Sequence, residues 1–341
     1  MLRYAHVGYP RAASTWLQFF LFPRHPDLHH FGRHNGDDIL DDDLRIALWN
    51  DLIARPALLY DSQEVARTFQ RLYASAAERK AVACGISQEV LTLFPFVGTV
   101  DLFERARRLH LAMGDGTRII IVVRNQLDWI RSMFCQLLKE GGMPLEWGEF
   151  LFYFYYQQDD SPFCTLFFDR VYEAYVDLFG EENVHVIPFE LIMRDVSVFA
   201  AEICRAIGVS PLFGVPKQST NERPSAKALS AHLQYNRQNA FYLGSNHFRR
   251  PWGFASAPMY HKRFGVDAPA WTTQERVRSL FGFEHMEAAV REAEKKGERI
   301  PAMDTTFPAT YQELLIKEYA PHNHRLMKLA HVDLRTFGYP L

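Results

Sequence analysis

The segment from Arg118 to Val123 (RIIIVV) constrains the fold of this chain more than any other part of its sequence. The arginine is followed there by an uninterrupted run of β-branched apolar residues. A strand with one wet face alternates polar and apolar residues, whereas a continuous apolar run is typical of a strand covered on both faces. We therefore predict a central parallel sheet with helices packed against each side.

Other segments supply the remaining parts of such a sheet. Short apolar runs predict strands at Leu2–Val7, Ala81–Ile86 and Val184–Pro188. The segment Asp27–Asp43, which is rich in His, Gly and Asp, is predicted to be mainly loop. Amphipathic patterns predict helices at Ser14–Phe22, Leu44–Ile53, Ser62–Glu78, Thr99–Met113, Gln126–Leu138, Ser161–Phe179 and Ser197–Ile207. Strands that alternate with helices favour βαβ units and a three-layer α/β/α fold.

Strand patterns fade after residue 215, so the last part of the chain is predicted to differ from the first. Gly244–Trp271 is rich in aromatic residues, Pro, Gly and Arg, which indicates a long ordered loop. Helices are predicted at Thr273–Lys296 and Pro308–Ala330. We predict one domain over 1–341, with an α/β core over 1–215 and a mostly helical and loop part over 216–341.

Composition excludes some classes of partner and location. The formal net charge is −2, whereas a protein that binds a nucleic-acid polymer usually carries a surplus of basic side chains. We therefore expect no nucleic-acid partner. The N-terminus lacks the apolar stretch of a signal peptide, and no run of about 18 apolar residues occurs. No membrane span is expected, and a cytoplasmic location is predicted.

Cysteine and histidine patterns do not predict a metal site. The cysteines lie in apolar contexts without any CxxC pair, and are expected to be reduced core residues: Cys84, Cys135, Cys164 and Cys204. A histidine-rich stretch contains His25, His29, His30 and His34. Its spacing does not match a zinc site and no cysteine joins it, so a solvated loop is the favoured interpretation.

The first predicted strand runs into the loop Gly8–Trp16 (GYPRAASTW) and then into a helix. Main-chain N–H groups and the positive end of the helix dipole make such a junction a ready anion site. Compared with the nucleotide P-loop, G-x-x-x-x-G-K-[ST], Ala13 replaces the second glycine and Ser14 replaces the lysine. That lysine reaches the terminal phosphates of ATP or GTP, so its absence argues against kinase chemistry. Arg11 supplies a cation instead, which favours a shorter anion.

A second basic motif follows the most apolar strand. Arg124 stands at the carboxyl end of that strand, where ligands of open α/β sheets bind. Ser132 lies about two turns into the next predicted helix, in reach of the same edge. A fixed guanidinium with a hydroxyl suits an isolated phosphate monoester. ATP has no such phosphate on its 3′ position, so this motif also disfavours a kinase.

In this order, the two motifs resemble those of sulfotransferases that use 3′-phosphoadenosine 5′-phosphosulfate (PAPS). GYPRAASTW resembles the family's 5′-phosphosulfate loop, in which Pro-Lys or Pro-Arg precedes small residues and hydroxyl residues. It departs from that pattern at Ala13, often Gly, and at Ser14, often Thr. Arg124 with Ser132 resembles the family's 3′-phosphate motif, an arginine at a strand end and a serine in the helix beyond.

The resemblance implies a P-loop-like fold with helical C-terminal additions. It also implies sulfuryl transfer from PAPS to an acceptor hydroxyl, on a carbohydrate or another small molecule, with release of adenosine 3′,5′-bisphosphate and without a metal. Nucleotide binding is then assigned to Arg11, Ala12, Ala13, Ser14, Thr15, Trp16, Arg124 and Ser132. The resemblance says nothing of oligomeric state.

Further segments are similar to bacterial members of the family. Phe179–Glu190 resembles a later helix-to-strand segment, and Leu334–Pro340 resembles the end of those chains without carrying evident chemistry. Asn221–Ser225 resembles the start of their C-terminal part, which makes Arg223 or Lys227 a candidate to cover the nucleotide. The alternative for Arg223 is ordinary solvated surface charge.

Catalytic roles are predicted for three residues. Arg11 is expected to stabilise the leaving phosphate. A hydroxyl acceptor benefits from a general base, and Glu89, which follows the strand Ala81–Ile86, is the first candidate. A carboxylate that stabilises a helix start is the open alternative for Glu89. His34, in the loop after the first helix, is the second candidate.

Two other functions remain open from the sequence. One is a P-loop kinase-like phosphotransferase, which the missing lysine opposes. The other is a non-catalytic nucleotide-binding relative, favoured only by Ala13 in place of glycine. The sulfotransferase prediction requires Arg11 and Arg124 to face one shared ligand.

Overall fold

The structure is a computed structural model that describes residues 1–32, 41–93, 100–139, 143–158, 162–216, 224–238, 261, 265 and 286–341. The chain forms two compact units. The first unit comprises Met1–Gln126, Asp160–Thr220 and Ile316–Leu341, and the second comprises Leu127–Asp159 and Asn221–Leu315. Each unit is described by itself.

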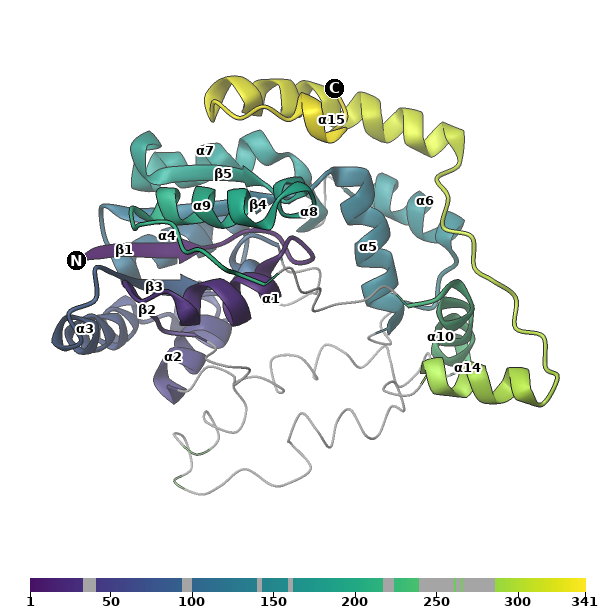
Figure 1. Cartoon of the computed structure of the whole chain (residues 1–341), viewed down its shortest axis with the longest axis horizontal. Helices are drawn as coiled ribbons and strands as arrows, with labels where there is room; N and C mark the ends of the chain where they lie inside the picture. Colours follow the sequence, from purple (N-terminus) through teal and green to yellow (C-terminus); the bar gives the residue numbers. More distant parts are fainter. Residues whose placement is uncertain are drawn as a thin grey trace. The chain divides into compact units, whose positions relative to one another are not determined.

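The first unit is built on a five-stranded sheet in the order β2-β3-β1-β4-β5 (Figure 1). Its strands are β1 (Leu2–His6), β2 (Leu28–His30), β3 (Ala83–Ser87), β4 (Thr117–Val123) and β5 (Val184–Pro188). All four strand pairs are parallel. Since parallel strands share a direction, their carboxyl ends meet at one edge of the sheet. The predicted parallel sheet is confirmed.

Helices cover both faces of this sheet. The helices α4 (Leu102–Met113) and α7 (Phe168–Phe179) pack beside each other, and α7 contacts β4 and β5. On the opposite face α9 (Val196–Ile207) contacts β1, β4 and β5 (Figure 1). This arrangement explains why the apolar run of β4 is buried almost throughout. The predicted three-layer α/β/α fold is confirmed.

Local sequence signals set the limits of these helices. The helix α3 (Ser62–Glu78) begins after Asp61, whose carboxylate accepts from the main-chain N–H groups of Gln63 and Glu64. Asp101 and Asp195 cap α4 and α9 in the same way. Gly208, in a left-handed conformation, ends α9. These caps account for the close match between predicted and observed boundaries.

Strand β2 lies in a segment that we predicted to be loop. Its sequence, LHH, lacks the apolar pattern of a strand. His30 is nevertheless buried, because its ring packs on Phe22 and its Nδ1 hydrogen-bonds the hydroxyl of Tyr4 at 2.9 Å. The strand is therefore buried through a histidine that packs on aromatic rings, whereas sequence patterns identify strands by their aliphatic residues.

The first predicted helix begins at Ser14, as expected, but changes its winding along its length. It consists of α1 (Ser14–Trp16), the π-helical segment η1 (Leu17–Leu21) and the 3₁₀ segment η2 (Phe22–Arg24). The predicted helix Leu44–Ile53 likewise divides into α2 (Asp42–Ile46) and the π-helical η3 (Ala47–Asp51).

The regular secondary structure in the described parts of the second unit is helical. It includes α5 (Gln126–Lys139), which starts at the end of the first unit, α6 (Trp147–Gln157), α10 (Ala226–Gln238) and α14 (Met286–Lys295). An aromatic cluster of Phe134, Trp147, Phe150 and Phe307 joins α5 and α6 to the segment before α15 (Ala309–Leu329). We did not predict α6 or α10.

Most of the predicted loop Gly244–Trp271, and the start of the predicted helix Thr273–Lys296, lie outside the described residues. Within the described ranges, no helix has both the length and the hydropathy needed to cross a membrane.

Candidate functional site

The loop after β1 runs alongside β4 before it turns into the first helix. The main-chain N–H groups of Val7 and Tyr9 donate to the carbonyls of Ile120 and Val122, at 3.0 and 3.2 Å. A Cβ at Gly8 would lie 2.7 Å from the nitrogen of Val122, closer than unbonded atoms can approach. Glycine is therefore needed there, because only a residue without a side chain lets the loop lie this close to β4.

The turn itself uses a left-handed backbone at two residues that are not glycine. The φ angles of Arg11 and Ala13 are 66° and 64°. Ala13 is the N-cap of α1 and has no side-chain acceptor for the N–H groups of the first turn. Left-handed residues in a turn can direct main-chain N–H groups toward an anion. In this loop the N–H of Ala12 donates to the carbonyl of Tyr9 at 3.2 Å. The anion cradle stays a prediction that the left-handed turn supports.

Side chains of the cradle differ in how they are placed. Ala12 and Ser14 are buried, whereas Arg11, Ala13 and Thr15 are half-buried. Ser14 stands where the P-loop motif has a lysine, so this position holds a short, uncharged and buried side chain.

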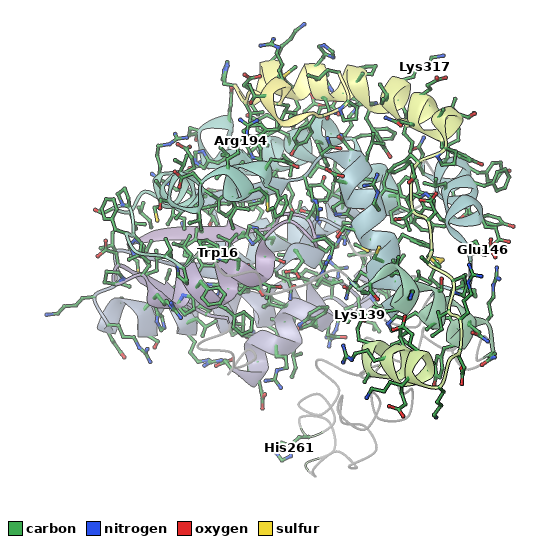
Figure 2. All side chains as sticks on the ribbon, turned by 45° about the vertical axis from the view of Figure 1, so that its right-hand side comes forward. Trp16, Lys139, Glu146, Arg194, His261 and Lys317 are labelled. Carbon is green, nitrogen blue, oxygen red and sulfur yellow. The ribbon has the colours of Figure 1, made fainter. Side chains whose placement is uncertain are left out.

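Trp16 is a core residue rather than an open one. Its indole N–H donates to the carbonyl of Pro216 at 3.1 Å, and its ring meets Phe199 of α9 edge to face. Figure 2 labels it on the N-terminal part of the ribbon. The side chain thus anchors the first helix against α9.

Arg124 lies at the carboxyl end of β4 and reaches the cradle. Its guanidinium Nη1 donates to the main-chain carbonyl of Arg11 at 2.8 Å. Its Cζ also lies 4.7 Å from the centre of the Phe189 ring. The two basic motifs, 113 positions apart in the sequence, therefore meet at one edge of the sheet.

A polar cluster lies at the same edge, at the ends of β1 and β3. Gln18 Nε2 donates to Glu89 Oε2 at 3.2 Å and to Ser87 Oγ at 3.1 Å. Ser87 Oγ also hydrogen-bonds His6 Nδ1 at 2.7 Å. Complete burial lowers the pKa of His6 to about 3, so its imidazole is neutral at physiological pH. Glu89, which begins the 3₁₀ segment η5 (Glu89–Leu91), accepts from the side-chain amide of Gln18 in this cluster.

Three further site residues were predicted from the sequence. Ser132 is half-buried on α5 and belongs to the second unit. His34 and Arg223 lie outside the described residues. In the ranges that the structure describes, no group of three or more His, Cys, Asp or Glu side chains is placed to hold a metal ion.

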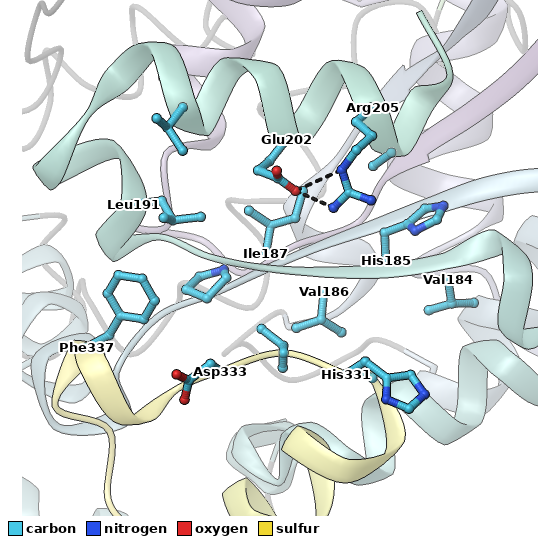
Figure 3. Close-up of a pocket in the computed structure, with 15 residues that line it drawn as sticks. Val184, His185, Val186, Ile187, Leu191, Glu202, Arg205, His331, Asp333 and Phe337 are labelled. Atoms are coloured by element: carbon cyan, nitrogen blue, oxygen red, sulfur yellow. Dashed lines mark hydrogen bonds and ion pairs between the residues drawn. The ribbon is translucent and has the colours of Figure 1, made fainter.

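A cavity of about 420 Å³ lies away from the cradle, along β5 (Figure 3). Residues of β5, α9 and the segment Ala330–Asp333 line it, with the Glu202–Arg205 ion pair on one side. None of the residues that we predicted for the site lines this cavity.

Our sequence reasoning missed several residues of this edge. His6 and Ser87 end parallel strands, so the rule that ligands bind at strand ends would have selected them. Gln18 gave no signal, because an amide inside a predicted helix is ordinary. Glu190 and Tyr339 contact each other at the loop after β4. They lie in the segments Phe179–Glu190 and Leu334–Pro340, whose resemblance was noted without a role for either residue.

Comparison with known proteins finds relatives by structure only. No protein-family model matches the chain, and no curated protein matches it in sequence. The chain is similar to the crystal structure of a sulfotransferase from Alicyclobacillus acidocaldarius, with 18% identity, a TM-score of 0.46, and coverage of 71% of this chain and 95% of that one. It is also similar to the sulfotransferase domain of the olefin synthase from Synechococcus PCC 7002, with 14% identity, a TM-score of 0.37, and coverage of 79% and 95%. Because both identities are below 25% and both TM-scores are below 0.5, these similarities assign no role to any residue of this chain.

Proposed function

We propose that this chain transfers a sulfuryl group from PAPS to an acceptor hydroxyl and releases adenosine 3′,5′-bisphosphate. The observation that carries the proposal is the hydrogen bond from Arg124 to the carbonyl of Arg11. It brings an anion cradle and a strand-end arginine to one edge of the sheet, as a nucleotide with separate 5′ and 3′ anionic groups requires.

The residue types of the cradle support a sulfated rather than a triphosphate donor. Ser14, which occupies the P-loop lysine position, is buried and carries no charge. Charge on a terminal phosphate would therefore lack its usual lysine partner. The half-buried Arg11 instead supplies a cation beside the first helical turn. One cation with main-chain N–H groups suits a phosphosulfate.

In the proposed reaction, the acceptor oxygen forms a bond to sulfur while the bond between sulfur and the bridging oxygen breaks. The electron pair of that bond passes to the 5′-phosphate. By analogy with phosphoryl transfer through a loose transition state, the protein mainly positions the reactants and stabilises charge. Arg11 stabilises the leaving phosphate, while Ser14, Thr15 and the N–H groups of the first turn hold the phosphosulfate. Arg124 binds the 3′-phosphate. A role for Ser132 in this binding is proposed on the sequence resemblance alone.

The acceptor's proton passes to Glu89 in this scheme. Its carboxylate accepts from Gln18, which fixes one oxygen and orients the other. Glu89→Gln should therefore lower kcat about 100-fold or more, while the affinity for adenosine 3′,5′-bisphosphate stays unchanged. Unchanged turnover in this variant would show that Glu89 is not the base, and His34 would be the next residue to test.

The acceptor class and the location are proposed on the sequence resemblance alone. A carbohydrate or another small molecule is the proposed acceptor, and the cytoplasm is the proposed location. Arg223 remains a candidate to cover the nucleotide.

Ligand binding tests the function directly. Adenosine 3′,5′-bisphosphate should raise the melting temperature, because a ligand at about 100 times its Kd stabilises the folded state by about 2.7 kcal/mol. Mg·ATP should raise it much less. Transfer of labelled sulfate from PAPS to a panel of acceptors then identifies the substrate.

Each other outcome selects a different function. Stronger stabilisation by Mg·ATP would favour a phosphotransferase and overturn the proposal. Tight binding of the bisphosphate, with no transfer to any acceptor and no hydrolysis of PAPS, would favour a non-catalytic nucleotide-binding protein.

A further inference from the structure

The C-terminal segment Leu334–Pro340 packs on the loop that carries Arg124. It contains the 3₁₀ turn η11 (Arg335–Phe337) and reverses at Gly338, whose φ of 72° is a left-handed conformation that favours glycine. Leu334 and Tyr339 are buried. We call Leu334–Pro340 the C-terminal clamp.

Two hydrogen bonds tie the clamp to the residues beside Arg124. Asn125 Nδ2 donates to the carbonyl of Gly338 at 2.5 Å. The hydroxyl of Tyr339 donates to Glu190 Oε2 at 2.8 Å, and the other oxygen of Glu190 accepts from the main-chain N–H of Asn125 at 2.9 Å. Glu190, the first residue of α8 (Glu190–Arg194), therefore links the clamp to the main chain directly after Arg124.

A second, buried connection holds the next residue. Asn323 Nδ2 donates to the carbonyl of Pro340 at 2.9 Å, and its Oδ1 accepts from Gln126 Nε2 at 2.8 Å. Asn323 is fully buried, so these bonds form away from competing water. Both residues that follow Arg124 are thus fixed by contacts that include the clamp.

Glu190 also acts on Arg124 electrostatically. Burial raises the pKa of Glu190, while hydrogen bonds from Asn125 and Tyr339 and the positive charge of Arg124 favour its ionised form. Phe189, the preceding residue, lies against the guanidinium and donates its main-chain N–H to the carbonyl of Val123 at 2.7 Å. The guanidinium of Arg124 therefore lies against Phe189 and interacts with the charge of Glu190, whose carboxylate accepts a hydrogen bond from Tyr339.

We propose that the C-terminal clamp is a positioning element for Arg124, and that Tyr339, through Glu190 and Asn125, sets how tightly the site holds the 3′-phosphate of its nucleotide. This inference rests on the proposed function. Tyr339 touches neither the nucleotide nor the acceptor in this scheme, so it is a positioning residue.

Tyr339→Phe tests the clamp because it removes one hydroxyl and keeps the buried ring. Calorimetric titration with adenosine 3′,5′-bisphosphate and with adenosine 5′-monophosphate separates the 3′-phosphate contribution from the rest. We expect the bisphosphate to bind about 10-fold more weakly and the monophosphate to bind as in the unchanged protein. The matched control is Tyr172→Phe, which also removes a tyrosine hydroxyl bond, to the carbonyl of Leu329, at a buried position of the same unit. It should leave both affinities unchanged.

Two results would overturn the inference. One is an equal loss of affinity for both nucleotides in Tyr339→Phe, which indicates general loosening of the site. The other is that neither affinity changes. Failure of the proposed function is distinct, since the unchanged protein would then bind the bisphosphate no better than the monophosphate.

A double-mutant cycle with Arg124→Lys tests whether the clamp acts through Arg124. If it does, Tyr339→Phe should change the affinity ratio much less in the Arg124→Lys background than alone. Strictly additive effects would show that Tyr339 acts by another route, and would contradict the proposed mechanism.

Discussion

The loop after β1 and the loop after β4 end neighbouring strands of one sheet, yet they are held in opposite ways. The first is fixed by its own backbone, through Gly8 lying close to Val122 and through the left-handed turn at Arg11 and Ala13. The loop after β4 has no such local device. It is fixed by Glu190 and by the C-terminal clamp, which approach it from later parts of the chain.

This contrast separates two kinds of anion site. A loop shaped by its own backbone can be recognised as a motif, because the residues that shape it, Gly8, Arg11 and Ala13, lie close together in the sequence. An arginine that is positioned by distant residues gives no such motif, because only the arginine itself can be recognised in the sequence. The hydrogen bond from Arg124 to Arg11 joins the two sites, so a change in either is expected to reach the other.

Removal of the charge at the first loop should have the largest effect. Arg11→Ala should lower kcat with PAPS by about 100-fold to 1,000-fold, because it removes a donor that stabilises charge in the transition state. Arg24→Ala is the matched control, since Arg24 ends the same helical segment and is exposed. Steady-state kinetics measure the effect, and thermal melting confirms the fold. Equal turnover of the two variants would remove Arg11 from catalysis.

The loop after β4 should respond in binding rather than in rate. Arg124→Lys keeps the charge but loses the fork that reaches both a phosphate and the carbonyl of Arg11. We expect affinity for adenosine 3′,5′-bisphosphate to fall by about 10-fold to 100-fold, the contribution of a hydrogen bond to a charged group. Arg118→Lys is the control, because Arg118 lies on the same strand and also donates to a carbonyl, that of Ala206. A similar loss in both variants would contradict a special role for Arg124.

Backbone packing of the first loop can be tested at Gly8. Gly8→Ala should lower the free energy of unfolding by about 1–3 kcal/mol, because the new Cβ forces the loop away from Val122. Gly148→Ala, in α6, meets nothing within 4 Å and should be neutral or slightly stabilising. Denaturant unfolding measures both. A neutral Gly8→Ala would show that the loop has another way to pack on β4.

A separate test concerns pH and His6, the neutral histidine that ends β1. The pKa of His6 falls from 6.5 to about 3 on folding, so the unfolded chain takes up the proton first. The stability that His6 contributes is therefore complete above pH 6.5 and is lost as the pH falls toward 3, by about 1.4 kcal/mol per pH unit. The difference in unfolding free energy between the unchanged protein and His6→Gln should shrink over this window. A difference that stays constant would contradict the assigned protonation state.

Sequence patterns predicted the parts of the fold that depend on local repetition. The apolar run of β4 and the capped helix α3 were located almost to the residue. Strand β2 was missed, because His30 is buried by aromatic neighbours and not by an aliphatic pattern. Helix α6 was missed as well, since aromatic residues occur on its buried and its exposed faces and hide the helical period.

In the candidate site too, the sequence predicted features that depend on adjacent residues and missed those that depend on distant ones. GYPRAASTW predicted the cradle because its geometry is a property of nine adjacent residues. The spacing of Arg124 and Ser132 predicted a second anion site, but could not identify Glu190, Asn125 or Tyr339 as its supports. Contacts between residues so far apart carry no periodic signal, so a single sequence does not reveal them.

The position of Gly338 and Tyr339 has a consequence for how the protein is made. A ribosome completes β1, β4 and Arg124 long before it adds the two residues that secure the loop after β4. A growing chain, or one cut short before Gly338, therefore has the arginine without its support. The loop after β4 gains these two contacts only when the segment that contains Gly338 and Tyr339 has been made and has folded onto it.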